Sequence, residues 1–135
     1  MAPSDPKVHT TRMRVRYADT DTSGIVYYAS YFLYFETGRV EMFRELGLPY
    51  DYHLPIVETA CRYRAPARFD DLLEVHSLVE ETRSKGFKIK HRVHRVQDDG
   101  TLELLAEGHT SMVTVGEDRR PVPLPEPYAH AFRAT

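Results

Sequence analysis

Two carboxylates precede an apolar stretch in the segment Tyr17 to Tyr28, which reads Y-A-D-T-D-T-S-G-I-V-Y-Y. They belong to Asp19 and Asp21, and the pattern that follows predicts a long helix beginning at Ser30. The unpaired N–H groups and partial positive charge of a helix N-terminus can hold the oxyanion of a carbonyl group under attack. A carboxylate beside that carbonyl can attack it or activate water to do so. The segment therefore predicts a minimal acyl-transfer site, although the same residues also suit turns and packing.

Other kinds of site lack the residues that they need. The seven histidines are scattered without the spacing or carboxylate neighbours of a metal site. No G-x-S-x-G serine elbow and no glycine-rich phosphate loop is present. The single cysteine, Cys61, lies among apolar neighbours and is expected to pack as a small hydrophobic residue. We therefore expect no metal and no cofactor.

Length and charge exclude further classes of protein. A chain of 135 residues fits one domain, residues 1–135. Its 18 basic and 20 acidic residues leave a net charge of -2, so no strong field favours nucleic acid. No apolar run is long enough for a membrane span, and the first residues do not resemble a secretory signal. With one cysteine, the chain is expected to be a soluble cytoplasmic protein.

The pattern of apolar residues predicts an α+β domain. Alternation predicts a strand over Thr11–Tyr17, and three- and four-residue spacing predicts a helix over Ser30–Leu46, with Ser30 as N-cap and Gly47 at its end. Four more strands are expected, with turns at Ser84–Gly86 and Asp98–Gly100 that make the last three an antiparallel meander. Their ranges are Ile56–Arg64, Leu72–Glu80, Phe87–Gln97 and Leu102–Val115.

The resulting layers are one long helix and a five-stranded antiparallel sheet. The core is expected over residues 8–115, and the proline-rich tail, 116–135, is expected to be extended. A single sheet of this kind leaves an edge open, and pairing of two copies would cover it.

Three stretches of sequence together resemble a known family. They are Y-A-D-T-D-T-S-G-I-V-Y-Y-A-S-Y-F, E-T-G-R-V-E-M-F-R-E-L-G and Y-R-A-P-A-R-F-D-D. They resemble the hotdog-fold acyl-CoA thioesterases of the 4-hydroxybenzoyl-CoA thioesterase family, nearest to the branch linked to the Tol-Pal system. The resemblance implies a sheet wrapped around the long helix, and homodimers or homotetramers with active sites at subunit interfaces.

The resemblance also implies roles for individual residues. Asp21 matches the catalytic carboxylate, as nucleophile or general base, and the backbone N–H of Tyr28 matches the group that polarises the thioester carbonyl. The Tol-Pal branch commonly has histidine where this chain has Tyr28, which leaves the acyl group open. Glu36 and Glu41 are alternatives to Asp21 because another hotdog lineage uses a helix carboxylate. The acyl group is expected in an apolar slot lined by Tyr17, Tyr27, Tyr28 and Tyr31, and Gly24 is also expected to bind substrate. Arg83, Ser84, Lys85 and Lys88 are expected near the coenzyme A phosphates, although such cations also suit the solvated end of a strand.

The leading hypothesis is hydrolysis of acyl-CoA thioesters with a short or aromatic acyl group, coenzyme A being part of the substrate. One alternative is a non-catalytic acyl-CoA binding or scaffold module with the same fold. Another is a hotdog enoyl-CoA hydratase, which needs a histidine beside the carboxylate.

Overall fold

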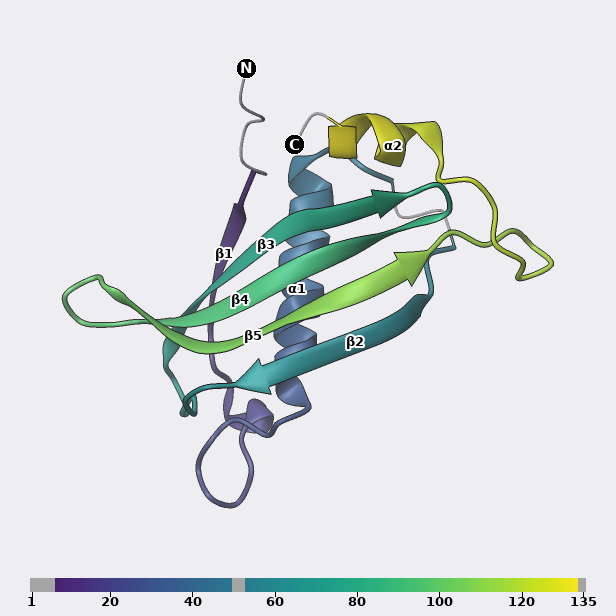
Figure 1. Cartoon of the computed structure of the whole chain (residues 1–135). Helices are drawn as coiled ribbons and strands as arrows, with labels where there is room; N and C mark the ends of the chain where they lie inside the picture. Colours follow the sequence, from purple (N-terminus) through teal and green to yellow (C-terminus); the bar gives the residue numbers. More distant parts are fainter. Residues whose placement is uncertain (1–6, 50–52, 134–135) are drawn as a thin grey trace.

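One antiparallel sheet crossed by a long helix dominates the computed structural model, which describes residues 7–49 and 53–133 (Figure 1). The order of strands across the sheet is β1-β3-β4-β5-β2, so β1 and β2 are its edges. The predicted fold class and the meander of β3, β4 and β5 are confirmed. The strands are β1 (His9–Arg14), β2 (Ile56–Tyr63), β3 (Leu72–Arg83), β4 (Gly86–Val96) and β5 (Leu102–Val113), and the helices are η1 (Tyr17–Asp19, a 3-10 turn), α1 (Ser30–Glu45) and α2 (Glu126–Arg133).

Helix α1 lies against one face of the sheet, and the core fills the space between them (Figure 1). Gly38 allows the close approach, because a Cβ atom there would lie 2.6 Å from Oγ of Ser77 on β3. Two apolar clusters are separated along the strands by Ser77, His91 and Thr110. Burial lowers the pKa of His91 to about 3, so this imidazole is neutral where it meets the two hydroxyl groups.

The first strand ends earlier than predicted. It was expected to reach Tyr17 but ends at Arg14, and Tyr17 begins η1 instead. The turn forms because the Asp19 carboxylate accepts the backbone N–H of Arg16 at 3.0 Å. Ser30 is the first helical residue rather than the N-cap, and its hydroxyl donates to the carbonyl oxygen of Asp19.

The expectation of an extended tail is wrong for Glu126–Arg133, which forms α2. Tyr128 and Phe132 lie one turn apart and pack against Phe43 and Phe87, so the core continues past residue 115. The sequence after Pro125 is compatible with a helix because a proline in the first turn, Pro127, loses no intrahelical hydrogen bond.

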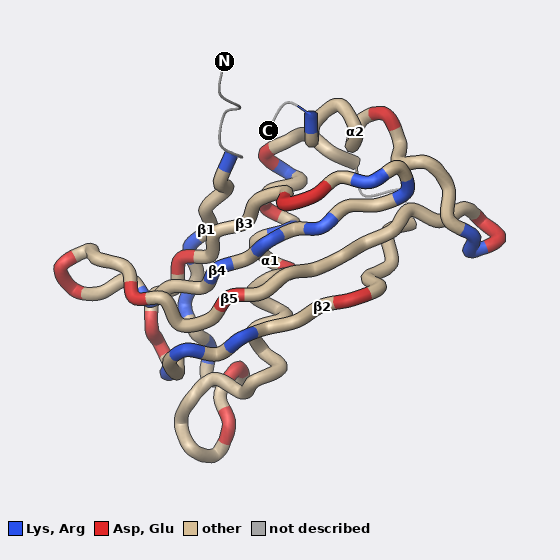
Figure 2. Tube along the Cα trace, viewed as in Figure 1, with Lys and Arg blue, Asp and Glu red and all other residues tan. Residues whose placement is uncertain are grey.

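Charged residues of both signs are interspersed along the strands and loops (Figure 2). This arrangement agrees with the near-neutral total charge. Among the described residues, no helix has the length and apolar character needed to cross a membrane.

Candidate active site

The loop between η1 and α1 is a tight turn that presents the side chain of Asp21. The backbone N–H of Asp21 donates to the carbonyl of Ile25 at 2.9 Å, and that of Gly24 donates to the carbonyl of Asp21 at 3.1 Å. Gly24 has φ +82°, a conformation that residues with a Cβ atom rarely adopt. Gly24 therefore shapes the turn that carries the Asp21 carboxylate.

Asp21 is exposed and its carboxylate is held by one neighbour. Ser23 donates both its hydroxyl and its backbone N–H to Oδ1 of Asp21. These hydrogen bonds, that of the hydroxyl first, hold the pKa of Asp21 below its usual range. The carboxylate is thus ionised at neutral pH, the state that a nucleophile or general base requires.

The backbone N–H of Tyr28 takes no part in the backbone hydrogen bonds that hold the loop among the described residues. The N–H of Tyr27 donates to the carbonyl of Asp19 at 2.8 Å, and the N–H of Ser30 donates to the carbonyl of Tyr27 at 2.9 Å. Within residues 7–49 and 53–133, the N–H of Tyr28 has no acceptor. It lies just before α1, where the helix dipole favours negative charge. This N–H can therefore donate to an external oxygen.

Asp21 and Tyr28 share a pocket of about 450 Å³. Its floor includes Tyr31, a buried residue whose hydroxyl oxygen accepts the N–H of Ala67 and whose ring meets Tyr63 edge to face at 5.1 Å. The Tyr63 hydroxyl donates to the carbonyl of Tyr28 at 2.7 Å. The pocket is mostly apolar apart from these groups, as in sites for small organic ligands. Its lining is completed by Ile25, Val26, Arg64, Ala65 and Pro66.

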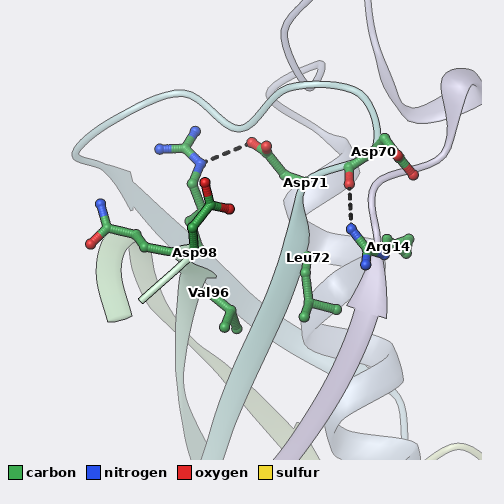
Figure 3. Close-up of a pocket in the computed structure, with 8 residues that line it drawn as sticks. Arg14, Asp70, Asp71, Leu72, Val96 and Asp98 are labelled. Carbon is green, nitrogen blue, oxygen red and sulfur yellow. Dashed lines mark hydrogen bonds and ion pairs between the residues drawn. The ribbon is translucent and has the colours of Figure 1, made fainter. Parts of the chain in front are cut away.

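The wall formed by residues 64–66 is anchored from behind by Arg95 on β4. The Arg95 guanidinium donates to Oδ2 of Asp71 at 2.9 Å, to Oε1 of Glu103 at 2.6 Å and to the carbonyl of Pro66 at 2.5 Å. Figure 3 shows the bond to Asp71 at the edge of a polar cleft of about 500 Å³, where Arg14 also donates to the carbonyl of Asp70. The wall of the Asp21 pocket is therefore held by Arg95 and its two carboxylate partners, which do not line that pocket.

Only part of the predicted substrate site comes together in one chain. Asp21, Tyr28 and Tyr31 line the pocket, but Tyr17, Gly24 and Tyr27 do not. Tyr17 is 78% exposed and meets Phe69 edge to face at 5.7 Å. Tyr27 packs on the ring of Tyr28 at 4.4 Å.

The turn between β3 and β4, which contains Arg83, Ser84 and Lys85, lies at the opposite end of the sheet from the loop between η1 and α1 (Figure 1). Ala106 on β5 pairs with Tyr63 and with Val93, whereas the turn of Arg83, Ser84 and Lys85 lies beside Gly86, seven residues along β4 from Val93. At about 3.3 Å per residue, that separation is roughly 20 Å. Arg83 is paired with Glu81, and Lys88 lies 3.7 Å from Glu80.

Sequence reasoning assigned no role in the site to Ser23 or Tyr63. The contact of Ser23 could have been predicted, because an aspartate side chain in a turn often accepts the backbone N–H of the residue two positions later. Tyr63 was placed on a strand, but its contact with Tyr28 depends on how β2 is positioned by β5, far along the chain. The two helix carboxylates lie elsewhere: Glu36 is exposed and Glu41 pairs with Arg44.

Comparison with known proteins identifies the family of the chain. The sequence profile described as "Thioesterase-like superfamily" matches residues 15–132. The acyl-CoA thioester hydrolase YbgC of Escherichia coli O157:H7 is 30% identical over an alignment of 128 residues, and the match covers 90% of this chain and 92% of that protein.

Two solved structures share the fold. A hypothetical protein from Thermus thermophilus is 37% identical with a TM-score of 0.83, covering 93% of this chain and 98% of that one. The 4-hydroxybenzoyl-CoA thioesterase of Pseudomonas sp. strain CBS-3 is 25% identical with a TM-score of 0.82, covering 92% and 98%. The family match, the related enzyme and the shared sheet and long helix together show that the chain belongs to the thioesterase-like superfamily and is a hotdog-fold thioester hydrolase.

Proposed function

We propose that this chain hydrolyses acyl-CoA thioesters with Asp21 as the reacting carboxylate and the N–H of Tyr28 as the oxyanion donor. The observation that carries the proposal is that an ionised carboxylate, Asp21, lines the same apolar pocket as Tyr28, whose backbone N–H has no acceptor among the described residues. The membership of the family supports the reaction class. The proposed setting is the cytoplasm, whose reducing conditions suit the free thiol of Cys61.

In the proposed reaction, the thioester carbonyl oxygen accepts the N–H of Tyr28 while the carbonyl carbon faces Asp21. The carboxylate either attacks this carbon or removes a proton from the water that attacks it. The negative charge that develops on the oxygen is stabilised by the N–H at the helix start. In either route the carbon–sulfur bond then breaks and coenzyme A leaves as the thiolate. Water supplies the second oxygen of the free acid, either in the first step when Asp21 acts as base, or by hydrolysing the acyl–Asp21 anhydride that direct attack forms.

The pocket favours an aromatic or short acyl group. Three tyrosine side chains, those of Tyr28, Tyr31 and Tyr63, contribute to the lining. Aromatic rings pack well edge to face against another ring. We therefore expect kcat/KM to be higher for benzoyl-CoA and short acyl-CoA thioesters than for palmitoyl-CoA. A series from acetyl- to palmitoyl- and benzoyl-CoA tests this order, and a preference for palmitoyl-CoA would contradict it.

The other two functions predict different results. A binding module would bind coenzyme A in calorimetry without turning over any thioester. An enoyl-CoA hydratase would need a histidine at the pocket, and none of the seven histidines lines it in the described chain. A hydratase would therefore have to take its histidine from a partner copy, and an enoyl-CoA hydration assay distinguishes the two reactions.

We also propose that two copies pair along β2 and that the assembly completes the site. Every residue of β2 except Cys61 is exposed, including the apolar Ile56, Val57 and Tyr63. The exposed charges of β2, Glu58 and Arg62, have opposite signs, whereas those of the other edge, β1, are Arg12 and Arg14, and like charges oppose edge pairing. Pairing of dimers into tetramers is the second step of this proposal. A further subunit would bring its Arg83 turn toward coenzyme A bound at this pocket.

Replacing Ala60 with lysine is expected to give a monomer. Ala60 is exposed near the middle of β2, so antiparallel pairing of two copies would bring the two lysines close together, and like charges there repel. Light scattering should give at least twice the chain mass of 15.6 kDa for the wild type and a single chain mass for Ala60→Lys. Thr10→Lys on β1 is the matched control and should keep the wild-type mass; an unchanged mass for Ala60→Lys would contradict pairing along β2.

Replacing Ser23 with alanine is expected to shift the acid limb of the pH profile upward. The variant loses the hydroxyl that contributes most to lowering the pKa of Asp21, but it keeps the backbone N–H. The reactive carboxylate is ionised above its pKa, so activity is present above that pH and is lost as pH falls through it. The fall in kcat/KM should therefore begin at a higher pH in Ser23→Ala than in the wild type. An unchanged acid limb would show that another group controls it.

A further inference from the structure

Asp19 is a buried carboxylate in a loop whose neighbouring side chains are largely exposed. It is 2% exposed, and both of its oxygens face hydrogen-bond donors. Oδ1 accepts hydrogen bonds from Nε and Nη2 of Arg16, at donor–acceptor distances of 3.2 and 2.8 Å. Oδ2 accepts the backbone N–H of Arg16 and the hydroxyl of Tyr34 on α1, each at 3.0 Å. The side chain thus connects the end of the first strand to the long helix.

The backbone of Asp19 connects the same loop to the helix start. Its carbonyl oxygen accepts the N–H of Tyr27 at 2.8 Å and the hydroxyl of Ser30 at 3.1 Å. Tyr27 precedes the proposed oxyanion donor, Tyr28, by one residue. Asp21, the proposed reacting carboxylate, follows Asp19 by two residues. Asp19 therefore connects the segment that carries both reacting groups to the long helix α1.

We propose that Asp19 is a positioning residue that sets the distance between the Asp21 carboxylate and the Tyr28 N–H. The proposal rests on the proposed function of these two groups. Asp19 does not line the pocket, and its oxygens are occupied by donors, so it has no direct part in the reaction. A displacement of about 1 Å between reacting groups can cost roughly 100-fold in rate.

The charge state of Asp19 agrees with this role. Burial by itself raises the pKa of the carboxyl, but the hydrogen bonds from Arg16 and Tyr34 outweigh burial and hold the pKa below its usual range. Asp19 is therefore ionised, and each of its two carboxylate oxygens accepts two hydrogen bonds. An asparagine of the same size would place its NH₂ group against donors in either orientation.

The test compares Asp19→Asn with the wild type at a temperature well below the melting temperature of either protein. We expect kcat to fall by about 100-fold, while the Kd of a non-hydrolysable thioether analogue of benzoyl-CoA changes less than about twofold. Tyr34→Phe, which removes one of the four donors, should lower kcat in the same direction by about tenfold. A kcat within threefold of wild type in Asp19→Asn, or in Tyr34→Phe if Asp19→Asn does not fold, would overturn the proposal.

Glu74→Gln is the matched control for the loss of a partly buried, paired carboxylate. Glu74 lies on β3, where it accepts Nε of Arg12 at 3.0 Å and meets Nε2 of His76 at 2.6 Å, away from the pocket. We expect it to lower the melting temperature while leaving kcat unchanged. A loss of kcat in Glu74→Gln equal to that in Asp19→Asn would show that the effect is one of stability, and would overturn the positioning role.

A second readout separates this proposal from the proposed function. If the wild type hydrolyses no thioester, the proposed function fails, and hydrogen exchange then tests the position of the loop alone. The amide of Tyr27, bonded to the carbonyl of Asp19, should exchange faster in Asp19→Asn than in wild type and Glu74→Gln. Equal exchange rates in the three proteins would overturn the role of Asp19.

Discussion

Asp21→Asn is expected to lower kcat for thioester hydrolysis by about 10²- to 10⁴-fold. The amide of asparagine carries no negative charge, so it can neither attack the carbonyl carbon nor take a proton from water. The fold should persist, because the only side-chain partner of Asp21 in the described structure is Ser23, in the same turn. Steady-state kinetics with benzoyl-CoA, with circular dichroism to confirm folding, checks the result.

The chain offers a closely matched control for this substitution. Asp99, in the turn between β4 and β5, is also exposed and accepts the N–H and the hydroxyl of Thr101, two residues later. Asp99→Asn therefore removes the same kind of turn carboxylate at a distance from the pocket. We expect wild-type kinetics for Asp99→Asn. Equal activities of Asp21→Asn and wild type would remove Asp21 from the reaction.

Replacing the backbone N–H of Tyr28 with an ester oxygen is expected to lower kcat by about 10²- to 10³-fold. The change deletes one donor and keeps the tyrosine side chain and the chain length. Its effect should be large because the N–H stabilises charge that develops only in the transition state, so kcat rather than KM carries the loss. The variant is made by incorporating the α-hydroxy acid analogue of tyrosine at position 28.

Tyr28→Phe separates the backbone from the side chain. It keeps the N–H and removes only the phenolic hydroxyl, which has no part in the proposed reaction. We expect kcat within about threefold of wild type for this variant. The oxyanion role would be rejected by an ester variant as active as the wild type, and it would pass to the side chain if Tyr28→Phe alone lost activity.

Most of the fold follows from short-range patterns in the sequence. Alternating residues and the turns at Ser84–Gly86 and Asp98–Gly100 predict the meander, and the spacing of Tyr31, Phe35, Met42 and Leu46 predicts α1. The structure of the tail was not predicted, because its prolines favour extended chain, whereas the burial of Tyr128 and Phe132 in the core stabilises α2. Tertiary packing outweighed local preference there.

The site could be predicted only where it is local in sequence. Asp21, Gly24 and Tyr28 belong to one short loop before a helix, so their proximity follows from the order of residues. The opposite wall, with Tyr63, reaches the loop through sheet pairing, and no periodicity predicts that contact. Asp19 looks like a turn residue in the sequence, and its burial and its bond to Tyr34 depend on how the helix that follows packs against the loop.

The most direct test of the central claim is whether the purified wild-type chain releases free thiol and free acid from benzoyl-CoA. Thiol release is followed with a colorimetric reagent and the acid by mass spectrometry, in the presence and absence of enzyme. We predict catalytic turnover in which the two products appear in equal amounts. Tight binding of acyl-CoA without release of thiol, from benzoyl-CoA or from any acyl-CoA of the series, would contradict the account and leave a binding module.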